Sequence, residues 1–163
     1  MKLIHIVGCQ NSGKTKLIIE LLKEFNARGL RVGTIKHTPH SYNLDKPGKD
    51  SFRHKAAGGN PAAIVTKNQM AVYLPREENE NPLDKLAPLF KGADLIIIEG
   101  YAQGPWKKLE VWRKEINPEP RFIQRSDIEA IITDDHMETN LPLWPRKNIP
   151  KLVEKILTLI EIN

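Results

Sequence analysis

The feature that most constrains the fold of this chain is a glycine-rich segment near its N-terminus, Gly8-Cys9-Gln10-Asn11-Ser12-Gly13-Lys14-Thr15. It matches the pattern G-x-x-x-x-G-K-[ST] in full. An apolar run (3–7) precedes it and an amphipathic segment (14–28) follows it. Strand, loop and helix in this order gather backbone N–H groups around a phosphate, beside the partial positive charge of a helix N-terminus. We therefore predict a phosphate-binding loop (P-loop).

We expect a nucleotide to contact this loop and the start of the helix. Lys14 would reach the β and γ phosphates as a point charge, and the Thr15 hydroxyl would bind a Mg²⁺ ion. A chance glycine-rich turn is the plainer alternative, which the flanking strand and helix argue against. The candidate nucleotide-binding residues are Gly8, Gln10, Asn11, Ser12, Gly13, Lys14, Thr15 and Lys16.

A carboxylate is expected at the end of a neighbouring strand, where it would hold the Mg²⁺ ion or its water. Glu99 lies near the end of a continuous apolar run (94–100), typical of a strand covered on both faces, and Asp50 follows a long loop (36–49). The predicted metal ligands are Thr15, Asp50 and Glu99, and Glu99 is also the candidate catalytic residue. The plainer alternatives are a helix cap for Asp50 and a strand end without a role for Glu99.

The rest of the chain alternates strands with helices. We expect strands at 31–35, 109–113 and 128–133, a hairpin at 62–66 and 70–74, and helices at 50–57, 82–90 and 148–160. This order predicts an α/β fold, the three-layer P-loop NTPase fold with a mostly parallel central sheet, with ligands at the carboxyl ends of the strands. At 163 residues, the chain is expected to form a single nucleotide-binding domain, 1–163.

Composition and charge limit the kinds of partner and the location that we expect for this chain. The net charge of +5 and the sequence pI of about 9.3 favour an anionic partner, which a nucleotide satisfies as well as a nucleic acid does. The sequence has no aromatic RNA-binding motif, and the full phosphate loop argues against a nucleic-acid-binding module. With Cys9 as its only cysteine and no apolar run of membrane-spanning length, the chain is expected to be cytoplasmic and without a membrane partner.

Three further segments carry a resemblance to a known family: Lys-His-Thr-Pro-His at 36–40, Asp-Lys-Pro-Gly-Lys-Asp-Ser at 45–51 and Asp-Leu-Ile-Ile-Ile-Glu-Gly-Tyr at 94–101. Together with the phosphate loop, they make the chain similar to the MobB family, molybdopterin-guanine dinucleotide biosynthesis protein B. The resemblance runs from the first strand to about Asp134, and the thirty C-terminal residues carry little of it.

The resemblance implies a GTP-binding accessory protein that helps attach GMP to the molybdenum-pterin cofactor, together with the guanylyltransferase MobA. It implies GTP and Mg²⁺ as ligands, a homodimer, and at most a slow GTPase activity. By the same resemblance, Gly13, Lys14 and Thr15 bind the triphosphate and Mg²⁺, and Asp50 and Glu99 occupy acidic positions of the family pattern.

Guanine recognition needs another element, because the sequence has no Asn-Lys-x-Asp segment, the usual guanine reader of signalling GTPases. Asp134 follows a late strand and resembles the Ser/Thr-Asp ending seen in the family. Its carboxylate could accept hydrogen bonds from guanine N1 and N2. A strand-to-loop aspartate is also common as a plain turn residue, which stays the alternative.

Basic residues after the second strand suggest a second anion site. Lys36, His37, Lys46 and Lys49 could hold the terminal phosphate of molybdopterin, since an adapter that joins GTP and pterin needs two anionic sites. A solvated basic loop is the alternative. The competing function is a P-loop small-molecule kinase, in which Glu99 or Asp50 would be the base and Arg121 and Arg125 would belong to a lid.

Overall fold

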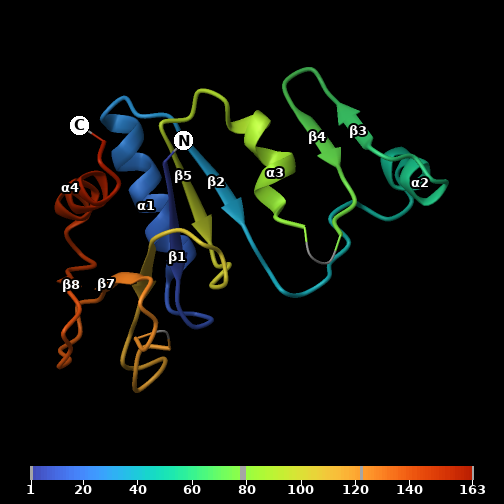
Figure 1. The fold of residues 1–163 in the computed structure, drawn as a ribbon. Coiled ribbons are helices and arrows are strands. Elements are labelled where there is room, and N and C mark those ends of the chain that lie inside the picture. Colours follow the sequence, from blue (N-terminus) through green and yellow to red (C-terminus); the bar gives the residue numbers. More distant parts are fainter. Residues whose placement is uncertain (1, 78–79, 122, 163) are drawn as a thin grey trace. The chain divides into compact units, whose positions relative to one another are not determined.

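A computed structural model describes residues 2–77, 80–121 and 123–162 of the chain. Its contacts divide the chain into two compact units, Met1–Thr38 with Phe90–Asn163, and Pro39–Leu89. Figure 1 shows the helices and strands of both units as a ribbon. The single domain predicted from chain length stays a prediction.

The first unit is built on a six-stranded sheet in the order β2-β5-β1-β6-β7-β8, and each strand pairing among the described residues is parallel. This confirms the α/β fold with its parallel sheet. The two-residue strand β8 was not predicted. The strands are β1 (Lys2–Val7), β2 (Val32–Lys36), β5 (Leu95–Glu99), β6 (Lys108–Val111), β7 (Ile128–Ile132) and β8 (Leu143–Trp144).

Helices α1 (Lys14–Ala27) and α4 (Ile149–Leu159) cover one face of this sheet. Leu17, Leu21 and Phe25 recur every four residues along α1, so they form one buried stripe against the sheet. Asn148 caps α4 by accepting the Lys151 N–H through its side chain. The main core consists of Ile4, Ile6, Leu17, Ile18, Leu21, Phe25, Leu95, Ile97, Leu109, Val111, Ala130, Ile132, Trp144, Leu152, Val153, Ile156 and Ile160.

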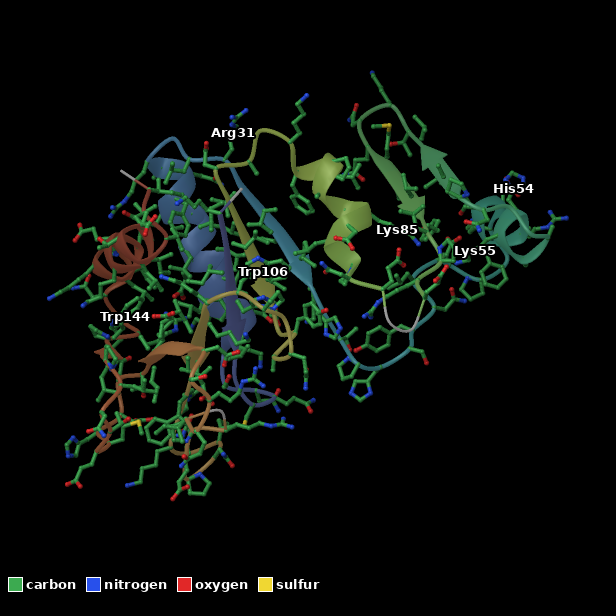
Figure 2. The ribbon with its side chains drawn as sticks, in the orientation of Figure 1. Arg31, His54, Lys55, Lys85, Trp106 and Trp144 are labelled. Carbon is green, nitrogen blue, oxygen red and sulfur yellow. The ribbon has the colours of Figure 1, made fainter. Side chains whose placement is uncertain are left out.

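The opposite face of the sheet buries polar groups. His5, Lys108 and Glu110 are each at most 1% exposed, and they alternate with core residues along β1 and β6. The segment between β5 and β6 covers part of this face, where the Trp106 ring stacks on His5 at 5.5 Å between centroids. Trp106 and Trp144 are labelled in Figure 2; the second is 7% exposed and belongs to the core on the helix-covered face.

The second unit contains α2 (Asp50–Ala56), the antiparallel hairpin of β3 (Ala62–Val65) and β4 (Met70–Tyr73), and α3 (Pro82–Leu86). A 3₁₀ turn, η1 (Ala87–Phe90), follows α3, and its last residue belongs to the first unit. These elements confirm the predicted hairpin and helices. No helix among the described residues is long and apolar enough to cross a membrane.

Candidate functional site

The phosphate loop joins β1 to α1, and its two glycines are needed for different reasons. Gly8 has a φ of 141°, and a Cβ placed on it would lie 2.4 Å from the Val111 carbonyl oxygen, so the neighbouring strand β6 excludes any side chain. Gly13 meets no such obstacle, but its φ of 92° is in the left-handed region that favours glycine. It is the residue that precedes α1, so the loop passes directly into the helix N-terminus.

Lys14 folds back over this loop. Its Nζ donates to the carbonyl oxygens of Gly8 at 3.0 Å and Cys9 at 2.6 Å. Burial lowers the pKa of Lys14, an effect that the nearby Glu99 carboxylate opposes. A cation held by carbonyl oxygens of the loop is placed where the loop would surround a phosphate.

Glu99 lies beside the loop, as predicted. It ends β5, which pairs with both β1 and β2, so it is in register with Ile6 on one side and Lys36 on the other. The Thr15 hydroxyl donates to Glu99 Oε1 at 2.8 Å, and Lys36 Nζ lies 3.4 Å from the same oxygen. The glutamate side chain is 14% exposed. The structure therefore brings together two of the three predicted metal ligands.

The third predicted ligand, Asp50, belongs to the second unit. It opens α2, its side chain is 90% exposed, and Arg53 Nη1 lies 4.0 Å from its Oδ1. The cap position is taken by Lys49, so the alternative of Asp50 as the helix cap is wrong. Its role as a metal ligand stays a prediction.

The predicted second anion site is divided between the two units. Lys36 pairs with Glu99, and the His37 ring stacks on Tyr101 with 4.5 Å between centroids. Lys46 and Lys49 lie in the second unit, where the buried Asp45 accepts the Lys46 N–H at 2.8 Å and the Ser51 hydroxyl at 3.2 Å. The site itself stays a prediction.

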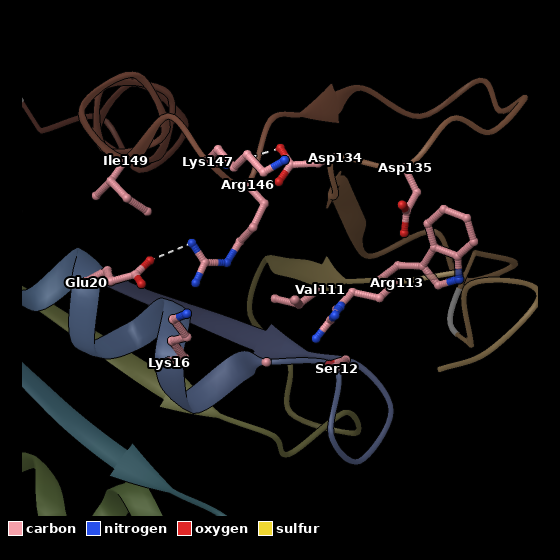
Figure 3. A pocket seen from close by; sticks show the side chains of 12 residues that line it. Ser12, Lys16, Glu20, Val111, Arg113, Asp134, Asp135, Arg146, Lys147 and Ile149 are labelled. Atoms are coloured by element: carbon pink, nitrogen blue, oxygen red, sulfur yellow. Dashed lines mark hydrogen bonds and ion pairs between the residues drawn. The ribbon is translucent and has the colours of Figure 1, made fainter. Parts of the chain in front are cut away.

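A cavity of about 600 Å³ opens beside the phosphate loop, within the range of small-molecule sites (Figure 3). Asp134, predicted as a base reader, lies in its wall, and its Oδ1 accepts the Lys147 N–H at 3.1 Å. Asp135 Oδ2 accepts the Lys114 N–H at 2.8 Å. The lining residues are Ser12, Gly13, Lys16, Glu20, Val111, Trp112, Arg113, Asp134, Asp135, Arg146, Lys147 and Ile149.

Sequence reasoning missed an ion pair in this cavity. Arg146 Nη1 lies 2.6 Å from Glu20 Oε2, and the two side chains are 20% and 32% exposed. Glu20 lies one helical turn after Lys16 on α1, while Arg146 lies in a proline-flanked segment without periodicity. In the sequence, Glu20 looks like any charged residue on the exposed side of a helix, so it gives no sign that it faces a cavity.

Buried polar contacts fix the segment that follows Glu99. His5 Nδ1 lies 3.2 Å from the Gly100 carbonyl oxygen, and its Nε2 has no hydrogen-bond partner among the described residues. Burial lowers the pKa of His5 to about 4, so the ring is neutral near pH 7. In the neutral ring the proton therefore lies on Nδ1, which donates to the Gly100 carbonyl, and Nε2 carries none.

Lys108 anchors the same segment from β6. Its ammonium donates to the carbonyl oxygens of Gly104 at 2.5 Å and Trp106 at 2.9 Å, and to Asp127 Oδ2 at 2.6 Å. Arg125 also binds this carboxylate, and hydrogen bonds from Arg125 and Lys108 hold the pKa of Asp127 below its usual range. Arg125, predicted for a kinase lid, is thus held in an ion pair.

Comparisons with known proteins agree with these features. A family model described as MobB, molybdopterin guanine dinucleotide synthesis protein B, matches residues 3–134. A molybdopterin-guanine dinucleotide biosynthesis adapter protein of Haemophilus influenzae is 34% identical over 159 residues, covering 94% of this chain and 86% of that protein. The Escherichia coli protein of the same name is 29% identical over 160 residues, covering 95% and 91%. The crystal structure of Bacillus subtilis MobB superimposes with a TM-score of 0.76 at 28% identity, covering 98% of both chains.

Proposed function

The chain belongs to the MobB family, and from that premise we propose that it binds GTP with Mg²⁺ as an adapter in molybdopterin guanine dinucleotide biosynthesis. The adapter role follows from family membership. The nucleotide, the metal ion and the partners are the proposal.

The contact between Thr15 and Glu99 is the observation that carries nucleotide binding. A phosphate loop alone is a local motif. Here the hydroxyl of Thr15, the last residue of the loop, donates a hydrogen bond to the carboxylate of Glu99, 84 residues further along the chain. Phosphoryl-binding sites of this class bring a hydroxyl from the last residue of the phosphate loop next to a carboxylate from the end of a neighbouring strand. The parallel register of β5 with β1 provides that arrangement.

The same two side chains fit a Mg²⁺ ion. Mg²⁺ prefers a few hard oxygen ligands and retains waters or takes phosphate oxygens for the rest. Thr15 Oγ1 and Glu99 Oε1, 2.8 Å apart, are such oxygens, and they would hold the ion directly or through water. When bound, the ion would neutralise phosphate charge. Lys36, beside Glu99, would add a further positive charge at that end of the site.

Hydrolysis is expected to be slow at most. Glu99 is the candidate catalytic residue, but its Oε1 already contacts both the Thr15 hydroxyl and Lys36 Nζ, so this oxygen is occupied rather than directed at an attacking water. Positioning of GTP for a partner enzyme agrees better with these contacts than turnover does.

The remaining parts of the proposal concern partners. We propose that the adapter acts in the cytoplasm with the guanylyltransferase MobA on molybdopterin, as a homodimer. The β3–β4 hairpin supports a protein contact, because Val65 is 70% exposed and Met70 is 78% exposed. An isolated two-stranded hairpin is marginally stable unless another surface covers it.

Calorimetric titration with GTP and with ATP, each with Mg²⁺, tests nucleotide binding. Lys14→Ala is expected to weaken GTP binding by about 10- to 100-fold, since it removes charge-assisted hydrogen bonds to phosphate. Lys23→Ala makes the same change on an exposed site of α1 and is the matched control. Absence of GTP binding by the wild type would overturn the proposal, and ATP binding of equal or greater strength would favour the small-molecule kinase.

A further inference from the structure

The cavity beside the phosphate loop has two walls that come from distant parts of the chain. One wall is α1, which contributes Lys16 and Glu20 and starts at the phosphate loop. The other contains the residues after β7 and β8, among them Asp134 and Arg146. Figure 3 shows Arg146 reaching from the second wall to Glu20 on the first. The ion pair therefore joins the two walls.

The second wall is itself held together by hydrogen bonds. The Thr133 N–H donates to the Trp144 carbonyl at 3.0 Å, and the Asp135 N–H donates to the Thr133 hydroxyl at 3.0 Å. The Lys147 N–H donates to Asp134 Oδ1. Asp134 and Arg146 are thus fixed on neighbouring loops, one carrying hydrogen-bond acceptors and the other donors.

A ligand whose phosphates occupy the loop would extend into this cavity, because Ser12 and Gly13 line both. Its far end would meet the carboxylate of Asp134 and the guanidinium of Arg146. Guanine presents donors at N1 and N2 and acceptors at O6 and N7, so it can satisfy both groups. Adenine has an acceptor at N1 and a donor at N6, which reverses the pattern and leaves a carboxylate facing an acceptor.

Resting on the nucleotide binding proposed above, we propose that Arg146, held by Glu20, is a specificity-determining residue that selects guanine together with Asp134. Glu20 is a positioning residue, since it acts by directing the guanidinium into the cavity. Glu20 takes part of the donor capacity of Arg146, which has five N–H groups, and leaves the others for O6 and N7 of the base.

Calorimetric titration of the full chain with GTP and ATP tests this assignment. Arg146→Met is expected to weaken GTP binding by about 10-fold and ATP binding by less than about 2-fold. The variant removes a protein donor that would bind the acceptors of guanine and would not bind adenine. Glu20→Gln should act in the same direction by about 3-fold, since the guanidinium stays but loses its charged partner. Asp134→Asn should invert the preference between GTP and xanthosine triphosphate, whose O2 accepts a hydrogen bond where guanine N2 donates one.

Arg28→Met is the matched control. Arg28 also links α1 to the C-terminal segment, through the Pro150 carbonyl and Glu154, but it does not line the cavity. Its loss should leave the ratio of GTP to ATP affinity unchanged. The exchanged pair Glu20→Arg with Arg146→Glu keeps the ion pair but moves the guanidinium to α1, so selectivity should stay low.

The outcomes separate this inference from the proposed function. Lack of GTP binding by the wild type overturns both. Tight GTP binding with an unchanged GTP to ATP ratio in Arg146→Met and Glu20→Gln overturns only the assignment of the ion pair. Recovery of selectivity in the exchanged pair shows that the contact serves only to hold the walls together, which also overturns recognition by Arg146.

Discussion

On one face of the central sheet, α1 and α4 bury a continuous apolar layer, whereas the face that carries His5 and Lys108 buries ionisable groups beneath connecting segments. Apolar packing depends on volume and shape and tolerates conservative exchange. Buried polar groups depend on specific partners, because each unsatisfied group carries its full desolvation cost. The buried polar groups hold the segment after Glu99 in one backbone path. The helix-covered face contributes apolar burial, whereas the polar face determines the conformation of a connecting segment.

Replacement of Lys108 by methionine should show the largest difference between the faces. The change removes three hydrogen bonds and leaves the Gly104 and Trp106 carbonyl oxygens without the ammonium. We expect a loss of about 3 kcal/mol in the free energy of unfolding, measured by urea denaturation. Leu109→Met, the next residue but on the helix-covered face, should cost about 1 kcal/mol or less. Equal losses would contradict the contrast.

The second largest difference is expected in the pH dependence of the free energy of unfolding, which His5 should dominate. Its folded pKa of about 4 is below the unfolded value of 6.5, so acid protonates the unfolded chain first. This contribution to stability is present in full above pH 6.5 and is lost as pH falls from 6.5 toward 4. Between pH 7.5 and pH 5 we expect a loss of about 2 kcal/mol, absent from His5→Asn. Asp127 titrates below this window because its pKa is lowered. A slope that persists in His5→Asn would assign the effect elsewhere.

A smaller effect is expected at Gly104. A Cβ there would lie 2.5 Å from His5 Cε1, so alanine must displace a ring held between Tyr101 and Trp106. We expect Gly104→Ala to cost about 1 to 2 kcal/mol in the free energy of unfolding. A double-mutant cycle with His5→Ala should remove most of this cost. Additive losses would mean that the His5 ring is not what excludes a side chain at position 104.

The smallest effect should come from Arg28, at the rim of the helix-covered face. Its side chain is 29% exposed and pairs with Glu24 on the same helix. Such pairs are screened by solvent, so Arg28→Met is expected to change the free energy of unfolding by about 0.5 kcal/mol or less. Urea denaturation at low and high salt checks this value. A loss comparable to that of Lys108→Met would show that α4 is held by ion pairs rather than by its apolar stripe.

Sequence periodicity predicted most of the fold. The strands and helices lie within a few residues of their expected ranges, because strong apolar patterns and clear glycine and proline boundaries define them. The strand β8 was missed, since two residues carry no period. The buried Lys108 was also hidden, because a lysine in a short strand gives the same pattern at an exposed edge as it does in a core.

The candidate site was predicted unevenly for a similar reason. The phosphate loop and Glu99 follow from a contiguous motif and from the end of an apolar strand, and the structure joins them. Glu20 and Arg146 are 126 positions apart and meet only through the packing of α1 against the C-terminal segment. No local pattern contains such a contact. Asp134 was proposed from its place after a strand and from the family resemblance, whereas its contact with Lys147 comes from the structure alone.

The sheet order also has a consequence for synthesis on the ribosome. β1 pairs only with β5 and β6 among the described residues, so the first strand made must wait for strands that begin at Leu95 and Lys108. Translation of the intervening residues takes roughly 5 to 20 s at ordinary rates. A nascent chain that stops before Leu95 contains the whole phosphate loop but neither of the strands that flank β1. We expect the growing chain to bind nucleotide only after synthesis has continued past β6 and this strand has left the ribosomal exit tunnel.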